Sequence, residues 1–159
     1  MLENCQNAHE RWGGVHKMID SWLNERQQLI VLYCNLSASK PLSVEEPLAK
    51  NIGRFCQVMM DSCSAGHFEI YEQLINEAKE FDDGGVELAI ELVPKLDKLT
   101  GQCVDFNDTY DQHCAFELLG KLPQDLSNIG EILEERFELE DQLIEQLHNV
   151  HKDQVAEEA

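Results

Sequence analysis

Apolar positions recur at helical spacing over four long stretches of the chain, residues 3–37, 46–81, 86–114 and 123–152. Within each stretch apolar residues return every three or four positions, which places them on one face of an α-helix. No stretch alternates apolar and polar positions with a period of two, so the sequence predicts no β-strand. Four such helices joined by short loops most simply form an antiparallel, up-and-down bundle, and we expect an all-α fold.

Proline and glycine mark the expected connections between these helices. Pro41 and Pro47 bound one loop, the acidic and glycine-rich run Asp82–Gly85 forms another, and Pro123 is typical of the first residue of a helix. Pro94 is expected to interrupt or kink the third helix. The length of 159 residues indicates a single domain, and we expect residues 153–159 to be frayed.

The apolar stripes define the expected core, one stripe from each helix. The first comprises Trp12, Val15, Ile19, Trp22, Leu23, Leu29, Ile30 and Tyr33. The second comprises Leu48, Ile52, Phe55, Met59, Cys63, Ile70, Leu74 and Phe81. The third comprises Leu88, Leu92, Leu96, Leu99, Cys103, Phe106 and Tyr110. The fourth comprises Leu126, Ile129, Leu133, Phe137, Leu143, Ile144, Leu147 and Val150.

Four polar residues fall inside these stripes when each residue is advanced by 100°. They are Arg26 in the first helix, His67 in the second, and Arg136 and Glu140 in the fourth. Because a singly buried charge is costly, we expect them to meet in a structural polar network. Glu140 should pair with Arg136 or Arg26, and His67 should lie nearby.

A metal site is the first alternative for the polar residues, because helix bundles hold di-iron centres through inward histidines and carboxylates. The candidate ligands are His16, Asp20, His67, Glu140, His148 and His151. Two arginines in the same layer would repel a divalent cation, so we predict no metal and no cofactor.

Phosphotransfer through His67 is the second alternative. That role needs an exposed histidine with positive charge nearby, whereas Glu69 and Glu72 lie beside His67 and no lysine is close. The sequence also has no glycine-rich phosphate loop and no recognisable nucleophile with a positioned base. We therefore predict that the protein is not an enzyme.

The second helix carries a further face, opposite its core stripe. Asp61, Phe68 and Ile75 follow one another there at steps of seven residues, with Val58, Ala65 and Glu72 alongside. Two interpretations stay open. Another segment of the chain, such as the one after Pro94, covers this face, or apolar anchors ringed by acids bind a partner protein.

The charge is strongly negative, with 12 Lys and Arg against 31 Asp and Glu, a net charge of −19. Such a protein repels phosphate, which argues against nucleic acid and anionic membranes as partners and favours a basic one. Plain solubility also explains acidity, and the acid-rich run at 131–145 is expected to be largely a solvated helix face. Repulsion between acidic surfaces favours a monomer.

The cysteines and the N-terminus indicate a cytoplasmic protein. Cys5, Cys34, Cys56, Cys63, Cys103 and Cys114 form no C-x-x-C pair, and we expect reduced thiols packed mostly as small hydrophobic groups. No apolar h-region opens the chain and no apolar run reaches the length of a membrane helix.

Three stretches resemble the Rsd/AlgQ family of bacterial anti-sigma factors. They are R-F-C-Q-V-M-M-D-S-C-S-A-G-H-F-E-I-Y-E-Q-L at 54–74, E-R-F-E-L-E-D-Q-L-I at 135–144 and E-R-W-G-G-V-H-K-M-I-D-S-W-L at 10–23. The last is similar to the AlgQ branch in particular. The resemblance extends over about residues 3–152.

The resemblance implies a helical bundle that binds region 4 of the primary sigma factor, the basic helix-turn-helix module that reads the −35 element and docks on core RNA polymerase. Covering region 4 would block both contacts, with no direct binding of nucleic acid. Asp61 matches the family's acidic contact to region 4, and Met18 matches a position in its sigma-contacting groove. Geometry extends this site to Ser64, Phe68 and Glu72. Family members have also been linked to small phosphocarrier proteins.

Overall fold

The computed structural model describes residues 8–38, 46–110 and 120–152, and these form helices almost throughout. The elements in chain order are α1 (Ala8–Ala38), α2 (Glu46–Ala65), a π-helix (Gly66–Ile70), α3 (Tyr71–Phe81), α4 (Gly85–Tyr110), α5 (Leu122–Leu147) and a 3₁₀ helix (Asn149–His151). No strand occurs in these ranges, which confirms the all-α prediction. Predictions that concern residues 1–7, 39–45, 111–119 and 153–159, including Cys5 and Cys114, lie outside the described part of the chain.

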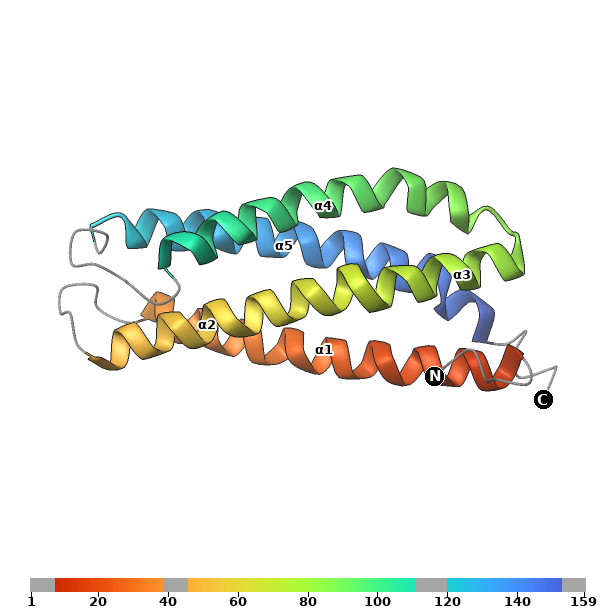
Figure 1. Ribbon diagram of the computed structural model, residues 1–159, viewed down its shortest axis with the longest axis horizontal. Coiled ribbons are helices and arrows are strands. Elements are labelled where there is room, and N and C mark those ends of the chain that lie inside the picture. The colour runs from red at the N-terminus through yellow and green to blue at the C-terminus, as the bar shows by residue number, and fades with distance from the viewer. Residues whose placement is uncertain (1–7, 39–45, 111–119, 153–159) are drawn as a thin grey trace.

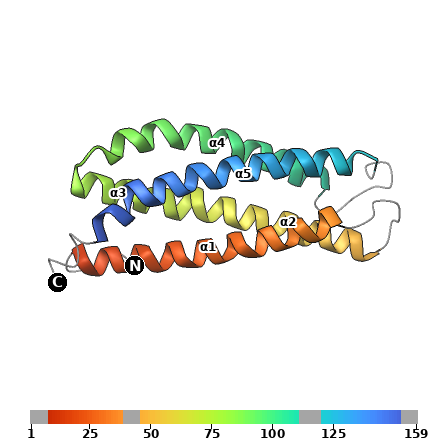
Figure 2. The same cartoon turned by 180° about the vertical axis from the view of Figure 1, so that it is seen from behind.

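The long helices lie side by side along one axis, and the chain reverses direction at each connection (Figure 1). α2, the π-helix and α3 follow one another as a single rod, so the bundle has four long members, as expected (Figure 2). No helix in the described ranges is long and apolar enough to cross a membrane.

The turn between α3 and α4 uses the acidic and glycine-rich run. Asp82 adopts the left-handed conformation, with φ of 48°, and donates its N–H to the carbonyl of Ala78 at 2.9 Å. Gly84 also has a positive φ, of 95°, which glycine tolerates without strain. The predicted loop is therefore confirmed, although Gly85 already belongs to α4.

Pro94 does not end the third helix, because α4 continues through it from Gly85 to Tyr110. A helical proline lacks the N–H that would bind the carbonyl four residues earlier. That carbonyl belongs to Ile90, an exposed residue, so water can take the place of the missing donor. The prediction that Pro94 interrupts the helical pattern is wrong.

Two apolar clusters fill the bundle, one towards each end. The first contains residues of α1, α2, α4 and α5 such as Phe55, Phe106 and Ile129. The second contains residues of α1, α3, α4 and α5 such as Ile19, Leu74 and Leu143. Most of the predicted core is confirmed as buried, and Trp12, Leu23, Tyr33, Phe81, Leu88 and Phe137 are half-buried at its margin.

Two predicted core residues are exposed, for different reasons. Ile30 lies at the edge of the α1 stripe, whose centre passes through Leu29 and Tyr33. Val150 is exposed because α5 ends at Leu147 and the following 3₁₀ turn changes which side chains face inward.

The described cysteines occur as free thiols, three of them buried (Cys56, Cys63 and Cys103) and Cys34 exposed. This agrees with the expectation of reduced cysteines that pack mostly as small apolar groups.

Candidate functional site: an acidic face over a polar layer

The outward face of α2 and the π-helix presents the residues that the sequence proposed for partner binding. Asp61, Ser64, Phe68 and Glu72 are all exposed, and the ring of Phe68 keeps 71% of its accessible surface. Met18 of α1 is half-buried and lies one turn before Trp22, whose indole N–H donates to the carbonyl of Ser62 in α2. The structure thus places these positions along the side where α1 and α2 meet.

A π-helix forms the centre of this face and changes the direction of its side chains. The N–H of Tyr71 bonds to the carbonyl of Gly66, five residues back instead of four. His67, Phe68 and Glu69 of this turn are all exposed. At the π-helix the face therefore presents three consecutive side chains to solvent.

Gly66 allows the π-helix to sit against α1. A Cβ at this position would lie 2.9 Å from Cζ2 of Trp22 and 3.1 Å from the ring of Tyr71. The rings of Trp22 and Tyr71 also contact each other edge to face, with centroids 6.0 Å apart. Close aromatic packing thus accompanies the extra residue of the turn.

His67 is not part of the buried polar network, and that prediction is wrong. Its side chain is 45% exposed, and Nδ1 lies 3.2 Å from Oδ1 of Asp97 in α4. The 100° rotation assumes an unbroken α-helix, whereas the π-helix displaces His67 from the core stripe. The ring is therefore exposed, as phosphotransfer through His67 would require. The acidic surroundings remain unsuited to a phosphoryl group, because Asp97 rather than a lysine meets the ring.

The second face is only partly uncovered. Val58, Ala65 and Ile75 are half-buried, and Ile75 packs against the apolar core. For Ile75 the first interpretation, cover by other parts of the bundle, therefore holds. Phe68 contacts the His67 ring edge to face, at 4.8 Å between centroids, and stays open to solvent.

Carboxylates from α1, α2 and the π-helix act on one another at this face. Partial burial raises the pKa of Glu25 in α1, and the negative charges of Asp61 and Glu69 raise it further. A site that resists the addition of one more negative charge attracts a cation. We call this surface the acidic face; it comprises Met18, Glu25, Asp61, Ser64, Phe68, Glu69 and Glu72.

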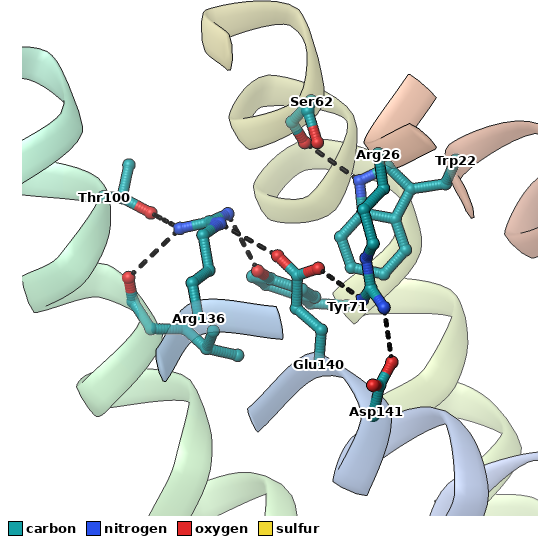
Figure 3. Close-up of polar contacts among 9 residues, drawn as sticks. Trp22, Arg26, Ser62, Tyr71, Thr100, Arg136, Glu140 and Asp141 are labelled. Atoms are coloured by element: carbon teal, nitrogen blue, oxygen red, sulfur yellow. Dashed lines mark hydrogen bonds and ion pairs between the residues drawn. The ribbon is translucent and has the colours of Figure 1, made fainter. Parts of the chain in front are cut away.

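A buried polar layer centred on Arg136 and Glu140 lies inside the bundle (Figure 3). Glu140 binds two arginines: its Oε1 is 2.8 Å from Nε of Arg136, and its Oε2 is 2.9 Å from Nη2 of Arg26. Arg26 also contacts Asp141, with 2.6 Å between Nη1 and Oδ1. The predicted pairing of Glu140 is confirmed, and both arginines take part.

The remaining donors of Arg136 bind neutral groups on the neighbouring helices. Its guanidinium donates to Oη of Tyr71 at 3.0 Å, to the hydroxyl of Thr100 and to the carbonyl of Leu96 at 3.4 Å. Burial would lower the pKa of Arg136, but the acidic groups around it raise the pKa above its usual value. Burial raises the pKa of Glu140, and both arginines oppose that rise. The layer thus joins α1, α3, α4 and α5 through one balanced set of charges.

A second polar cluster at the far end of the bundle escaped the sequence analysis. His148 and His151 are buried, and their Nδ1 atoms lie 2.9 Å and 3.5 Å from the two carboxylate oxygens of Glu77. Nε2 of His151 is 2.7 Å from Asp83, and Nε2 of His148 is 3.2 Å from Nδ1 of His16. In the sequence, His16, His148 and His151 were recognised only as candidate metal ligands.

The proposed metal ligands do not converge. His16, Asp20, His148 and His151 lie at one end of the bundle, whereas Glu140 belongs to the central layer and His67 to the outer face. Within the described ranges, no group of three or more histidine, cysteine or acidic side chains is arranged to hold a metal ion. The end cluster instead joins α1, α3 and the C-terminal 3₁₀ turn through hydrogen bonds.

Comparison with known proteins identifies the family of this chain. A family model described as "Regulator of RNA polymerase sigma(70) subunit, Rsd/AlgQ" matches residues 1–148. A protein named Regulator of sigma D from Yersinia pseudotuberculosis (strain IP 31758) is 36% identical over 153 residues, covering 91% of this chain and 88% of the relative. Its namesake from Pectobacterium atrosepticum is 37% identical, with 94% and 99% covered. No solved structure gives a significant match. The chain therefore belongs to the Rsd/AlgQ family of regulators of the RNA polymerase sigma(70) subunit.

Proposed function

We propose that this protein is an anti-sigma factor that binds region 4 of the primary sigma factor through the acidic face. Binding there would block the contacts of region 4 with the −35 element and with core polymerase. Sequestration requires no catalysis, so the protein acts as a cytoplasmic binding partner and not as an enzyme. Its relatives carry the name Regulator of sigma D, which supports a sigma subunit as the partner.

One observation carries the location of the site. An almost uncovered Phe68 lies on the π-helix next to Glu69 in the sequence, and the carboxylates of Glu69 and Asp61 are close enough to raise the pKa of Glu25. A large apolar side chain next to unpaired acids suits a partner that is both basic and partly apolar. A DNA-reading module such as region 4 has that character, because it meets phosphates.

The net charge supports the same partner class. At −19, the protein steers a basic module towards itself and repels both DNA and a second copy of itself. We therefore propose a monomer that competes with DNA for region 4. A phosphocarrier protein is a further proposed partner.

Charge reversal on the acidic face tests this proposal. Asp61→Lys places like charges against region 4 and should weaken binding by about a hundredfold or more, since buried interface charges are worth about 2–5 kcal/mol. The matched control is Glu87→Lys, an exposed carboxylate on α4 that changes the net charge equally. Binding is measured by titration of purified region 4, and folding by thermal melting.

The control separates a site from general attraction. Glu87→Lys should change affinity by no more than about threefold, as expected for a charge outside the interface. Equal losses for both variants would show that only the net charge matters. Normal binding by a folded Asp61→Lys variant would place the interface elsewhere. Displacement of region 4 from −35 DNA by the wild-type protein checks the competition.

A further inference from the structure

A second apolar surface lies on the other flank of α1, where it faces α5. Among the contacts that join these helices, Tyr33 Oη donates to the carbonyl of Leu126 at 2.9 Å, and Arg26 pairs with Asp141 at 2.6 Å. Between these contacts lies a hollow of about 180 Å³, with Leu29 and Phe137 among its lining residues. The side chains of α1 and α5 leave this space unfilled, unlike the close-packed interior of a protein.

Tyr33, whose hydroxyl bonds across to the carbonyl of Leu126, separates this hollow from a neighbouring one. The neighbouring hollow, of about 310 Å³, lies on the far side of that ring, with Leu36, Leu122 and Leu126 among its lining residues. Along α5 the two extend from Leu122 to Phe137, which at 1.5 Å per residue is roughly 22 Å. We call them together the α1–α5 groove. Its length matches about four turns of a bound helix.

The two rims of the groove differ in character. On α1, Ile30 lines the hollow and exposes 36% of its surface, although it is large and apolar. On α5, Glu131, Glu134 and Glu138 are all exposed and follow one another at three- and four-residue steps. Such spacing places the three carboxylates in a row along one side of the helix.

Positive charge near this row is already neutralised. The guanidinium of Arg26 lies 4.7 Å above the ring of Phe137 and binds both Glu140 and Asp141. The groove therefore offers an apolar floor, one apolar rim and one acidic rim. A ligand that satisfies all three has apolar side chains on one face and cations beside them.

We propose that the α1–α5 groove binds a basic amphipathic helix of a second protein. Its apolar side chains fill the two hollows, and its lysines or arginines face the carboxylate row of α5. A second copy of this chain is disfavoured, because it would set acidic rims against each other at a net charge of −19 per copy. The groove lies on a different flank of α1 from the acidic face, so this site goes beyond the proposed binding of region 4.

A synthetic peptide provides the probe. It has about 15 residues, all leucine and lysine, with leucines at i, i+3, i+4 and i+7 so that one face is apolar. An isomer of identical composition, with the leucines spread around the helix, controls for charge. An environment-sensitive dye on Cys34, an exposed thiol one turn from Ile30, reports occupancy in a background with Cys5 and Cys114 replaced by serine.

Two pairs of variants locate the binding. Ile30→Glu and Glu134→Lys change the groove, and each should weaken the amphipathic peptide about tenfold or more. Their controls, Ile90→Glu and Glu87→Lys, make the same substitutions at exposed positions of α4. These should alter affinity by less than about threefold. The isomer should bind at least about tenfold more weakly than the amphipathic peptide.

Each contrary result overturns the proposal. Equal binding of the two peptides would indicate charge attraction alone. Equal effects of Ile30→Glu and Ile90→Glu would show that the peptide does not bind in the groove. Loss of peptide binding in Asp61→Lys would show that the peptide binds at the acidic face. A dimer in sedimentation that Ile30→Glu dissociates would make the groove a self-association surface. Failure of region 4 to bind would leave this test unaffected, since no step of it uses the sigma factor.

Discussion

Removal of Arg136 tests whether the central polar layer is a set of matched charges. Arg136→Met keeps a long, unbranched side chain but removes the guanidinium. Oε1 of Glu140 and the hydroxyls of Tyr71 and Thr100 then lose their partner inside the bundle. Breaking a buried ion pair by removing one member costs about 3–5 kcal/mol. Glu140 keeps Arg26 at 2.9 Å, so we expect the lower end of that range.

A second substitution separates the charge from the packing. Adding Glu140→Met removes the remaining buried carboxylate, while Arg26 retains Asp141 at 2.6 Å. Replacement of a whole buried pair by apolar side chains is often neutral or stabilising. The double variant should therefore be more stable than Arg136→Met alone, by about 1 kcal/mol or more.

Urea unfolding followed by circular dichroism measures both differences. For a chain of this size, a loss of 3 kcal/mol lowers the melting temperature by about 6–12 °C. Arg54→Met, at an exposed position of α2, is the control and should stay within about 0.5 kcal/mol of wild type. The reasoning is refuted if Arg136→Met costs less than about 1 kcal/mol, or if the double variant is less stable than Arg136→Met.

Three further substitutions test other parts of the structure. Gly66→Ala drives a methyl group against Trp22 and should destabilise by about 1–2 kcal/mol net, since the overpacking exceeds the gain in helix propensity; a stabilised variant in urea unfolding would contradict this. His148→Ala removes a buried partner of Glu77 and should lower the free energy of unfolding by about 3 kcal/mol or more, again measured in urea. A loss within about 0.5 kcal/mol, the level of a surface change, would exclude the cluster as a stabilising element. The pKa of Glu25 is raised in the folded state, so the folded protein binds this proton more tightly, and the contribution of Glu25 to stability is lost as pH rises through that folded pKa. Glu25→Gln should therefore be more stable than wild type at neutral pH but not below the ordinary pKa of 4.5; a stability difference that is independent of pH would refute the shift.

The bundle and most of its core were predictable because helical periodicity is a local property. Leu92, Leu96 and Leu99 recur on one face whatever packs against them, and all three are buried. The partners of Glu140 were also predictable, because a charge buried on an apolar stripe loses its hydration and needs an opposite charge to compensate for that loss. Exposure of Asp61 and Phe68 followed from the same rotation, since both lie opposite the core stripe.

Two of the errors arise where the helix geometry itself changes. His67 was predicted in the core and lies outside, because the π-helix adds a residue between Gly66 and Tyr71. Val150 was predicted in the core and is exposed, whereas His151 is buried, because the chain leaves the α-helical path after Leu147. Neither change has a signal in the hydrophobic pattern, which assumes a constant rotation of 100° per residue.

The sequence by itself thus determined the four long helices, the inward position of their apolar stripes, the net charge of −19 and the outward position of Asp61. Only the tertiary structure decided how the helices adjust to one another. The rings of Trp22 and Tyr71 pack at Gly66 beside the π-helix that turns His67, Phe68 and Glu69 outward. Such adjustments depend on contacts between residues distant in the chain, whereas periodicity reports only the relation of a residue to its neighbours along one helix.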